Sequence, residues 1–418
     1  MPKLTNLVSI PTLVESPFII ADIGGYRFGT YHAEGYGSSL RVTYPNFMES
    51  VQITKVNGTV NTYQLNFIYQ VRAGQDPNLL DKIFSSAAND RKIILEYGDW
   101  NSPSYIYKEE VCIITNIKSS LDMNSSCIKY VLSCTSDAIG LASMTYDFPS
   151  RYEKPSDVLK QMVRSSKYGL REVFSGMLNS LDSLISSNDK KVNLSAQTGI
   201  TPLAYMNYLV GSMINYNNSE EKVIQDSVYV LTIHDDRTDN YSGSYFRVTE
   251  VSPNTRTLAT PDTYEVDVNF PGDNFVTNFT LNDDQSWAIL YKFSEQVNQE
   301  KYTYNISDEG AIVSQYAPVL ARSSFDTFSA ARSSWWTKMT QFPIQASLTI
   351  KGLTRPAILM NYVKVNVWFA GGQKHISSGL YIITKQVDTL NNTGYKTTLS
   401  LLRVGGDTDD TKSGIRRV

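Results

Sequence analysis

The sequence predicts an α+β chain that is mainly β, with two helix-capped β-barrel domains and an inserted mixed α/β domain. Three observations lead to this class. Runs that alternate apolar and polar residues recur in both halves of the chain, bounded by turn residues. Helical periodicity is confined to short segments. At 418 residues, the chain is also too long for one ordinary core. We therefore expect three domains, over residues 1–148, 149–245 and 246–418.

The first region opens with a predicted β-hairpin. Residues 51–56 lead into Asn57-Gly58, a dipeptide that favours the tight turn of a hairpin. The return strand, 63–71, alternates apolar and polar side chains, which indicates a sheet with one buried face. Further strands are expected at 92–97, 111–117 and 128–134. A small barrel is the economical arrangement for these strands, because closure removes exposed edges.

One helix is expected between these strands, from Asp76 to about Asn89. Asp76 is a good N-cap because its carboxylate can accept the free amides of the first turn. Pro77 suits the first helical position, where its missing N–H has no cost. The apolar stripe expected to face the sheet consists of Leu79, Leu80, Ile83, Phe84 and Ala87.

The middle region changes character and reads as a small mixed insertion. Pro155 begins a helix that carries apolar residues at helical spacing, and Thr201-Pro202 marks the start of a second helix. Strands return at 228–233 and 245–251.

The last region repeats the theme of strands, a helix and more strands. Residues 264–270 and 275–281 are strand-like, with a turn at 271–274, and a helix is expected across 324–339. Later strands are expected at 344–350, 362–369, 380–387 and 396–402. We identify no residue-level repeat between the two β regions, so the shared order is a pattern argument only.

The closing hairpin carries the most specific pattern in the sequence. Its first strand contains Ser-Gly-x-Tyr-x-Ile from Ser378 to Ile383, after the glycine-rich turn at Gly371-Gly372. Its second strand contains Tyr-x-Thr-x-Leu-x-Leu-x-Arg from Tyr395 to Arg403. This hairpin resembles that of phage tail hub proteins and of related baseplate and contractile-injection hubs. Residues 74–83 and 97–99 resemble the same family more loosely.

The resemblance implies a structural role in a virion. Hubs of this family carry two domains similar to the tail-tube protein, plus inserted domains. Three copies form a ring of six tube-like barrels, which adapts a six-fold tube to a three-fold tip, and DNA leaves through the lumen. The implied partners are a second and third copy, a tail-tube or distal-tail protein, and a spike or fibre-bearing tip protein. The protein would be made in the host cytoplasm and would act in the phage tail.

Composition excludes several other classes. The formal net charge of -3 argues against a protein held on nucleic acid by phosphate contacts, so DNA would pass without sequence-specific binding. No stretch approaches the roughly 20 apolar residues of a membrane helix, and residues 1–10 do not form a secretory signal. Cys112, Cys127 and Cys134 lack metal-ligand spacing, and we expect free thiols, as suits a reducing cytoplasm.

Several motifs that could carry chemistry are assigned to structure instead, so no catalytic, cofactor-binding or metal-binding residue is predicted. His32, His234 and His375 do not pair at ligand spacing, and His375 is expected to be a solvated turn residue. Residues 235–240 have the acidic density of a calcium loop, but Arg237 stands where a carboxylate should, so a surface turn is favoured. The acidic segment 407–410 is an equally weak candidate for a calcium loop, because its ligand pattern is also incomplete.

The remaining candidates concern phosphate, sugar and hydrolytic sites. Residues 24–29 are glycine-rich but lack the lysine of a phosphate loop, so a flexible turn is expected. Glu109 and Glu110 are adjacent on a strand and should point to opposite faces. A sugar-stacking platform is weighed against core or interface packing, and packing is favoured. Its aromatic residues would be Tyr291, Tyr302, Trp335 and Trp336.

Two other functions stay open at this point. One is a host-adhesion or carbohydrate-binding tail-tip protein, for which we would expect an enzymatic or lectin-like extension that the short segment after Val404 does not supply. The other is a tube-terminator or neck protein, which shares the barrel but fits less well with two β halves.

Overall fold

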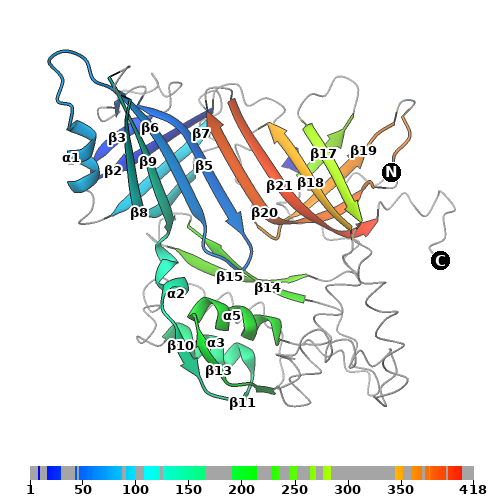
Figure 1. The fold of residues 1–418 in the computed structure, drawn as a ribbon. Helices are drawn as coiled ribbons and strands as arrows, with labels where there is room; N and C mark the ends of the chain where they lie inside the picture. The colour runs from blue at the N-terminus through cyan, green and yellow to red at the C-terminus, as the bar shows by residue number, and fades with distance from the viewer. Residues whose placement is uncertain are drawn as a thin grey trace, which may run out of the picture.

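The computed structural model describes residues 8–9, 17–29, 43–44, 47–86, 91–99, 108–122, 126–164, 191–213, 228–235, 244–251, 264–269, 276–283, 344–351, 359–369, 372–375, 377–391 and 394–406. These residues are mainly β-strands with a few short helices, so the mainly β class is confirmed. In Figure 1 the long strands form a broad row, and the middle region lies below it.

One 15-stranded sheet runs through both β regions of the described chain. Strand β5 (Met48–Val56) of the first region pairs antiparallel with β20 (Gly379–Asn391) of the last, from Val51 opposite Leu390 to Val56 opposite Lys385. The described strands form no closed barrel, which differs from the two separate barrels expected. The reason is local: the edge of β5 that could close a first barrel is occupied by β20.

The first region contributes most of the sheet. Besides β5, its strands are β1 (Val8–Ser9), β2 (Pro17–Ile23), β3 (Tyr26–Gly29), β4 (Thr43–Tyr44), β6 (Thr62–Gln70), β7 (Lys92–Asp99), β8 (Lys108–Asp122) and β9 (Cys127–Ser136). The alternation that predicted the β5–β6 hairpin is seen in its burial, since Tyr63, Leu65 and Phe67 are buried while the residues between them are not. Strands β1, β2, β3 and β4 were not predicted.

Helix α1 (Leu79–Ser86) covers this sheet as expected, although it begins later than its cap residue. The Asp76 carboxylate accepts the backbone N–H of Asn78 at 2.9 Å, which forms a turn ahead of the helix. Leu80, Ile83 and Phe84 are buried in the core. Ala87 and the expected end near Asn89 lie outside the described residues.

The hairpin turn after β5 contacts the middle region. Gly58 has a positive φ of 72°, and a Cβ placed there would lie 3.0 Å from the Oδ1 atom of Asn207. The backbone N–H of Gly58 donates to the Leu231 carbonyl at 2.7 Å. Glycine therefore serves both the turn and the close approach.

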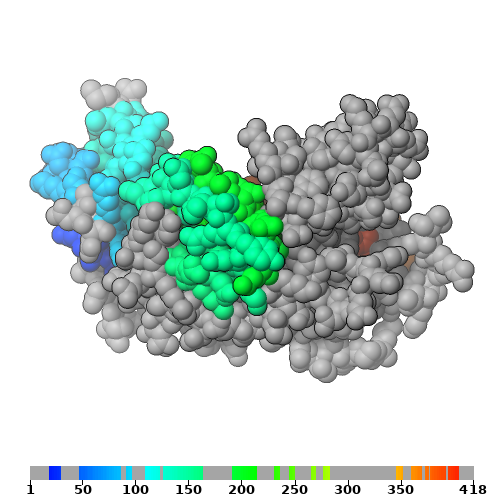
Figure 2. Space-filling view, turned by 90° about the horizontal axis from the view of Figure 1, so that it is seen from below, coloured from blue at the N-terminus to red at the C-terminus, as the bar shows by residue number. Residues whose placement is uncertain are grey.

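The middle region packs into a core of its own. Its elements are η2 (Asp137–Ile139), α2 (Gly140–Ser143), β10 (Tyr146–Phe148), β11 (Arg151–Glu153), α3 (Pro155–Arg164), β12 (Val192–Leu194), β13 (Gln197–Ile200), α5 (Pro202–Gly211), β14 (Val228–His234) and β15 (Tyr245–Val251). Thr201 caps α5, because its hydroxyl accepts the N–H of Ala204 at 3.2 Å. Phe246 and Val248 belong to this core, so β15 crosses the boundary expected at 245/246. Figure 2 shows this region as a compact surface beside the first β region.

The last region completes the sheet with β20 and five further strands. These are β16 (Tyr264–Val268), β17 (Val276–Asp283), β18 (Ile344–Lys351), β19 (Tyr362–Val367) and β21 (Gly394–Gly406). The turn expected at 271–274 does not make a hairpin of β16 and β17, because β16 pairs with β1 and β19 while β17 pairs with β18. The helix expected at 324–339 lies outside the described residues.

The two β regions repeat one pairing scheme, down to the irregularities in their strands. Strands β5, β6, β9, β8 and β7 are joined in the same order as β17, β18, β21, β20 and β19. The β8–β9 ladder shifts register after Ile114, and the β20–β21 ladder shifts after Ile383. In each case the next residue is a threonine, Thr115 or Thr384, which donates to the carbonyl of Ser133 or Ser400.

A second pair of irregularities supports the same correspondence. The β5–β6 ladder shifts between Met48 and Ser50, and the β17–β18 ladder shifts between Val276 and Asn278. Matching bulges in matching strands are specific features of a fold. The repeat that the sequence did not reveal is therefore present in the structure.

Candidate functional site

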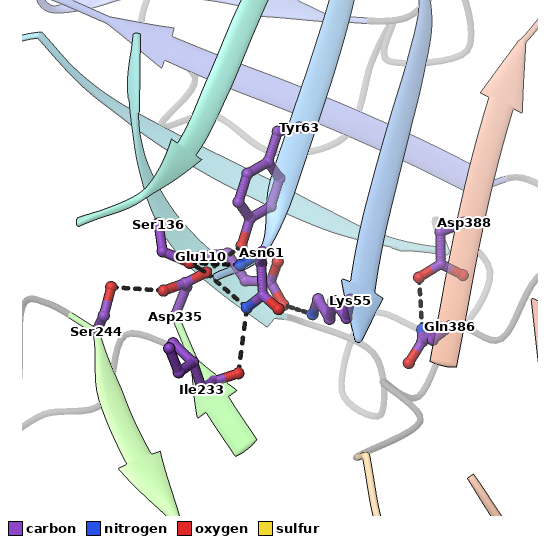
Figure 3. Close-up of polar contacts among 10 residues, drawn as sticks. All are labelled: Lys55, Asn61, Tyr63, Glu110, Ser136, Ile233, Asp235, Ser244, Gln386 and Asp388. Atoms are coloured by element: carbon purple, nitrogen blue, oxygen red, sulfur yellow. Dashed lines mark hydrogen bonds and ion pairs between the residues drawn. The ribbon is translucent and has the colours of Figure 1, made fainter. Parts of the chain in front are cut away.

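A network of buried polar and charged side chains lies where the three regions meet, and it is the candidate functional site of the described chain (Figure 3). It draws on β5, β6, β8 and β9 from the first region, the ends of β14 and β15 from the middle region, and β20 from the last. Its members are Lys55, Asn61, Tyr63, Glu110, Ser136, Asp235, Ser244, Gln386 and Asp388.

Asp235 is the centre of this network. Its Oδ2 atom accepts hydrogen bonds from the Tyr63 hydroxyl at 2.6 Å, the Ser136 hydroxyl at 2.7 Å and the Asn61 amide at 2.7 Å. Its Oδ1 atom accepts the Ser244 hydroxyl at 2.5 Å. Four donors on one carboxylate replace the water that this side chain, only 1% exposed, has lost.

Asn61 holds this arrangement to the backbone. Its own N–H donates to the Ser136 hydroxyl at 2.9 Å, and its carbonyl accepts the Ser136 N–H at 3.0 Å. Its side-chain amide also donates to the carbonyl of Ile233 at 3.2 Å, on strand β14. Asn61, which directly precedes β6, thus joins the first region to the middle region together with Tyr63 and Ser136.

Burial governs the ionisation of these groups. Loss of solvent raises the pKa of Asp235 above its ordinary value, although the four hydrogen bonds oppose that shift. Burial also raises the pKa of Tyr63 well above its usual range, and the charges of Asp235 and Glu110 add to the effect. Tyr63 therefore stays protonated and remains a donor.

A buried ion pair lies beside this carboxylate. Lys55 and Glu110 form a salt bridge, with side chains 8% and 0% exposed. Lys55 also lowers the pKa of Asp388, while burial, the larger effect, raises it. The hydroxyl of Thr397 and the amide of Gln386 donate to the Asp388 carboxylate. The Lys55 ammonium on β5 therefore interacts favourably with two buried carboxylates, that of Glu110 on β8 and that of Asp388 on β20.

This arrangement suits a rigid joint between regions. Removing a partner would leave a buried charge without compensation, which disfavours any other relative placement of the strands. The network offers almost no surface to a substrate, since its carboxylates are 0–2% exposed. Within the described part of the chain, no cluster of three or more His, Cys, Asp or Glu side chains is placed to hold a metal ion.

Two expectations about single residues are wrong. Asp235 was assigned to a surface turn, but it is buried because the hydroxyls and amide of two regions converge on it. His375 was expected to be solvated, but it is half-buried: its Nδ1 atom lies 2.6 Å from the Ser377 hydroxyl, and its ring packs edge-on against Phe369. Sequence reasoning also did not single out Lys55, Asn61 or Asp388, because no local motif marks them.

Other expectations agree with the structure. Of residues 24–29, which were expected to form a flexible turn, Gly24 and Gly25 form the turn between β2 and β3, whereas Tyr26–Gly29 form strand β3. Glu110 is fully buried while Glu109 is half-buried, as adjacent strand residues should differ. All three cysteines are free, with Cys112 and Cys134 buried. Outside the described residues lie His32, Tyr291, Tyr302, Trp335 and Trp336, together with 236–240 and 407–410.

The closing hairpin packs into the core of the last region. Tyr381, Ile383, Leu399 and Leu401 are all buried in the core of the last region. The Tyr381 hydroxyl donates to the Ser377 carbonyl at 2.5 Å. Burial raises the pKa of Tyr381 to about 12. None of the described helices is long and apolar enough to cross a membrane.

Known structures match this fold, although no family model and no curated protein sequence matches the chain. The chain is similar to the tail protein from Neisseria meningitidis at 10% identity and a TM-score of 0.50, covering 93% of this chain and 97% of that one. It is similar to a prophage tail protein from Shewanella oneidensis at 11% identity and a TM-score of 0.48, with the same coverage. A type VI secretion component from E. coli matches at 8% identity and a TM-score of 0.45, over 88% of this chain and 75% of that one.

The first of these likenesses establishes the fold. Because the likeness extends over nearly the whole of both chains, this chain shares the fold of the Neisseria meningitidis tail protein. This likeness agrees with the resemblance carried by the closing hairpin, whereas the two closed barrels that the resemblance implied are not seen among the described strands.

Proposed function

We propose that this chain is a structural virion protein, a tail or baseplate hub that forms a homotrimeric, pseudo-hexameric ring. The ring would join the tail tube to the tail tip or spike, and its lumen would let DNA pass. The observation that carries this proposal is the repeated pairing scheme of the two β regions, joined edge to edge through β5 and β20. Three copies of a doubled unit supply six similar units, which matches the symmetry of a six-fold tube.

The proposal includes three domains, with tube-like domains at 1–148 and 246–418 around the insertion at 149–245. The middle region has a core of its own, which supports a separate insertion, although this core also includes Ala138 and Phe148 before residue 149 and Phe246 and Val248 after residue 245. The partners would be other copies of the chain, a tail-tube or distal-tail protein, and a spike or fibre-bearing protein. DNA would pass without sequence-specific binding, and the protein would neither enter a membrane nor catalyse a reaction. The network around Asp235 supports the structural role because it has almost no exposed surface.

The rival role in host adhesion or carbohydrate binding gains no support from the described residues. The aromatic side chains that motivated it, Trp335 and Trp336 among them, lie outside the described residues.

The mass of the purified protein in solution tests this function. Native mass spectrometry should give three times the chain mass of 46.9 kDa, and electron micrographs should show rings. A protein that stays monomeric at all accessible concentrations, or that binds glycans as a monomer, would contradict the proposal.

A further inference from the structure

The second half of β8 is an edge strand with apolar side chains on its surface. Residues 108–113 of β8 pair with β7, but no described strand pairs with the outer edge of 116–121. Leu121 is 71% exposed and Ile117 is 38% exposed, and the two lie on one face of the strand. An exposed strand edge of this kind is a template for pairing with another chain.

The matching strand of the last region shows what covers such an edge. In β20, residues 379–382 pair with β19, the register shifts, and residues 385–390 pair with β5. Gln386, Asp388 and Leu390 are 1–2% exposed there. They correspond to Ile117, Ser119 and Leu121 when Thr384 is matched to Thr115. The same positions are therefore buried in one region and exposed in the other.

Strand β17 is the counterpart of β5 and has an open edge too. It pairs with β18 on one side, and no described strand pairs with the other. Leu281, which corresponds to the buried Ile53, is 41% exposed. Figure 1 shows β8 and β17 far apart, toward opposite ends of the row of long strands, with β5 and β20 side by side between them. The two open edges therefore cannot meet within one chain.

We infer that β8 of one copy pairs with β17 of the next copy, antiparallel, as β20 pairs with β5 within the chain. This inference rests on the proposed ring and names the surface that builds it. Transferring the observed register places Leu121 opposite Phe279, Ser119 opposite Leu281 and Ile117 opposite Asp283.

The side chains on the two edges complement each other in this register. One face places Leu121 directly opposite Phe279 and sets Leu281 diagonally between Ile117 and Leu121, which removes exposed apolar area from water. Ser119 and Asp283 lie on this face too. The other face brings Lys118 and Ser120 against Asn282 and Thr280, which remain polar. A shift by one residue would place apolar side chains against the polar face, so the pattern specifies the register.

The association would be heterologous, since two different edges meet. A heterologous contact repeats from copy to copy and either closes into a ring or continues as a filament. The occupant of each edge is therefore a second copy of this chain. Each copy would contribute one internal junction, β5 with β20, and one external junction, β17 with β8.

Cysteine cross-linking between the edges tests this register. Ser120→Cys with Thr280→Cys, in a chain that also carries Cys127→Ser, places two thiols directly opposite on the polar face and leaves the apolar face intact. Opposite residues of an antiparallel pair lie close enough for a disulfide. Oxidation with copper phenanthroline should give covalent multimers on a non-reducing gel. The control, Ser119→Cys with Thr280→Cys, places its thiols on opposite faces and should stay uncross-linked.

The outcomes separate this inference from the proposed function. Rings that form without cross-linking of the Ser120–Thr280 variant would overturn the strand pairing and leave the hub function standing. A monomer without cross-links would overturn both. Equal cross-linking of the two double variants would overturn the register.

A surface variant provides an independent measurement. Leu121→Asp should leave the melting temperature of the monomer unchanged, because this side chain is exposed, while shifting the protein from multimer to monomer. Met144→Asp is the matched control, since Met144 is 63% exposed on a different element. Loss of assembly in both variants, or in neither, would contradict the inferred interface.

Discussion

The Tyr63 hydroxyl donates a 2.6 Å hydrogen bond to the Oδ2 atom of Asp235, a residue 172 positions later in the chain. This contact joins the first β region to the middle region inside a space that water does not reach. It identifies the joint between regions as the place where single substitutions should have the largest effects.

Tyr63→Phe should lower the free energy of unfolding by about 1–3 kcal/mol, because a buried carboxylate loses one of its donors. Urea denaturation measures this loss. Tyr69→Phe is the control: its hydroxyl donates to the neutral carbonyl of Asp76, and its removal should cost only about 0.5–1.5 kcal/mol. Equal losses of unfolding free energy in the two variants would mean that the hydrogen bond to Asp235 stabilises the fold no more than the bond to a neutral carbonyl does.

Asp235→Asn should change how stability depends on pH. Burial raises the pKa of Asp235 above its value in the unfolded chain, so the folded state binds the proton more tightly. The resulting stabilisation is complete below the unfolded pKa and is lost as pH rises through the folded pKa. The asparagine variant lacks this loss, so its stability relative to wild type should improve between pH 4 and neutral pH, as measured by denaturation at each pH. A relative decline would show that the four donors outweigh burial.

Lys55→Met should destabilise the protein more than Glu110→Gln does. Removing one partner of a buried ion pair costs about 3–5 kcal/mol. Loss of Lys55 also removes the charge that favours ionised Asp388, whereas Glu110→Gln leaves that interaction in place. Unfolding free energies of both single variants and of the double variant measure this difference. If Glu110→Gln proves the more harmful, the shared role of Lys55 is wrong.

Tyr381→Ala should lower both the stability and the soluble yield of the protein. Loss of a large buried aromatic side chain costs about 3–5 kcal/mol, and Tyr381 also donates to Ser377. His375→Ala, in the turn ahead of β20, should cost less because that ring is only half-buried. Thermal unfolding of the two variants checks this. A reversed order would mean that the turn, and not the strand, holds the hairpin together.

The sequence predicted the elements whose patterns are local. Alternation around Leu65 and Phe67 located β6, and the cap at Thr201 located α5. Strand β2 was missed because its run of apolar residues, Phe18 to Ala21, does not alternate.

The relations between distant segments could not be predicted in the same way. The pairing of β5 with β20 depends on which of several similar edges meet, and period-two patterns do not encode that choice. The repeat was hidden because only Ile-Ile-Thr at 113–115 and 382–384 is shared at the bulge. Asp235 looked like part of an exposed acidic loop, since its four donors come from residues 61, 63, 136 and 244.

The core of the first region includes Leu390 and Tyr395. This core therefore cannot be completed until the ribosome has synthesised the last region of the chain. Ribosomes add about 5–20 residues per second. Strand β20 therefore emerges on the order of tens of seconds after β9, and β5 lacks its partner strand during that interval. During that interval the edge of β5 is open to any other strand, including one from a neighbouring nascent chain. Expression at lower temperature or with a chaperone that holds unfolded strands should therefore raise soluble yield more than any change in buffer after lysis.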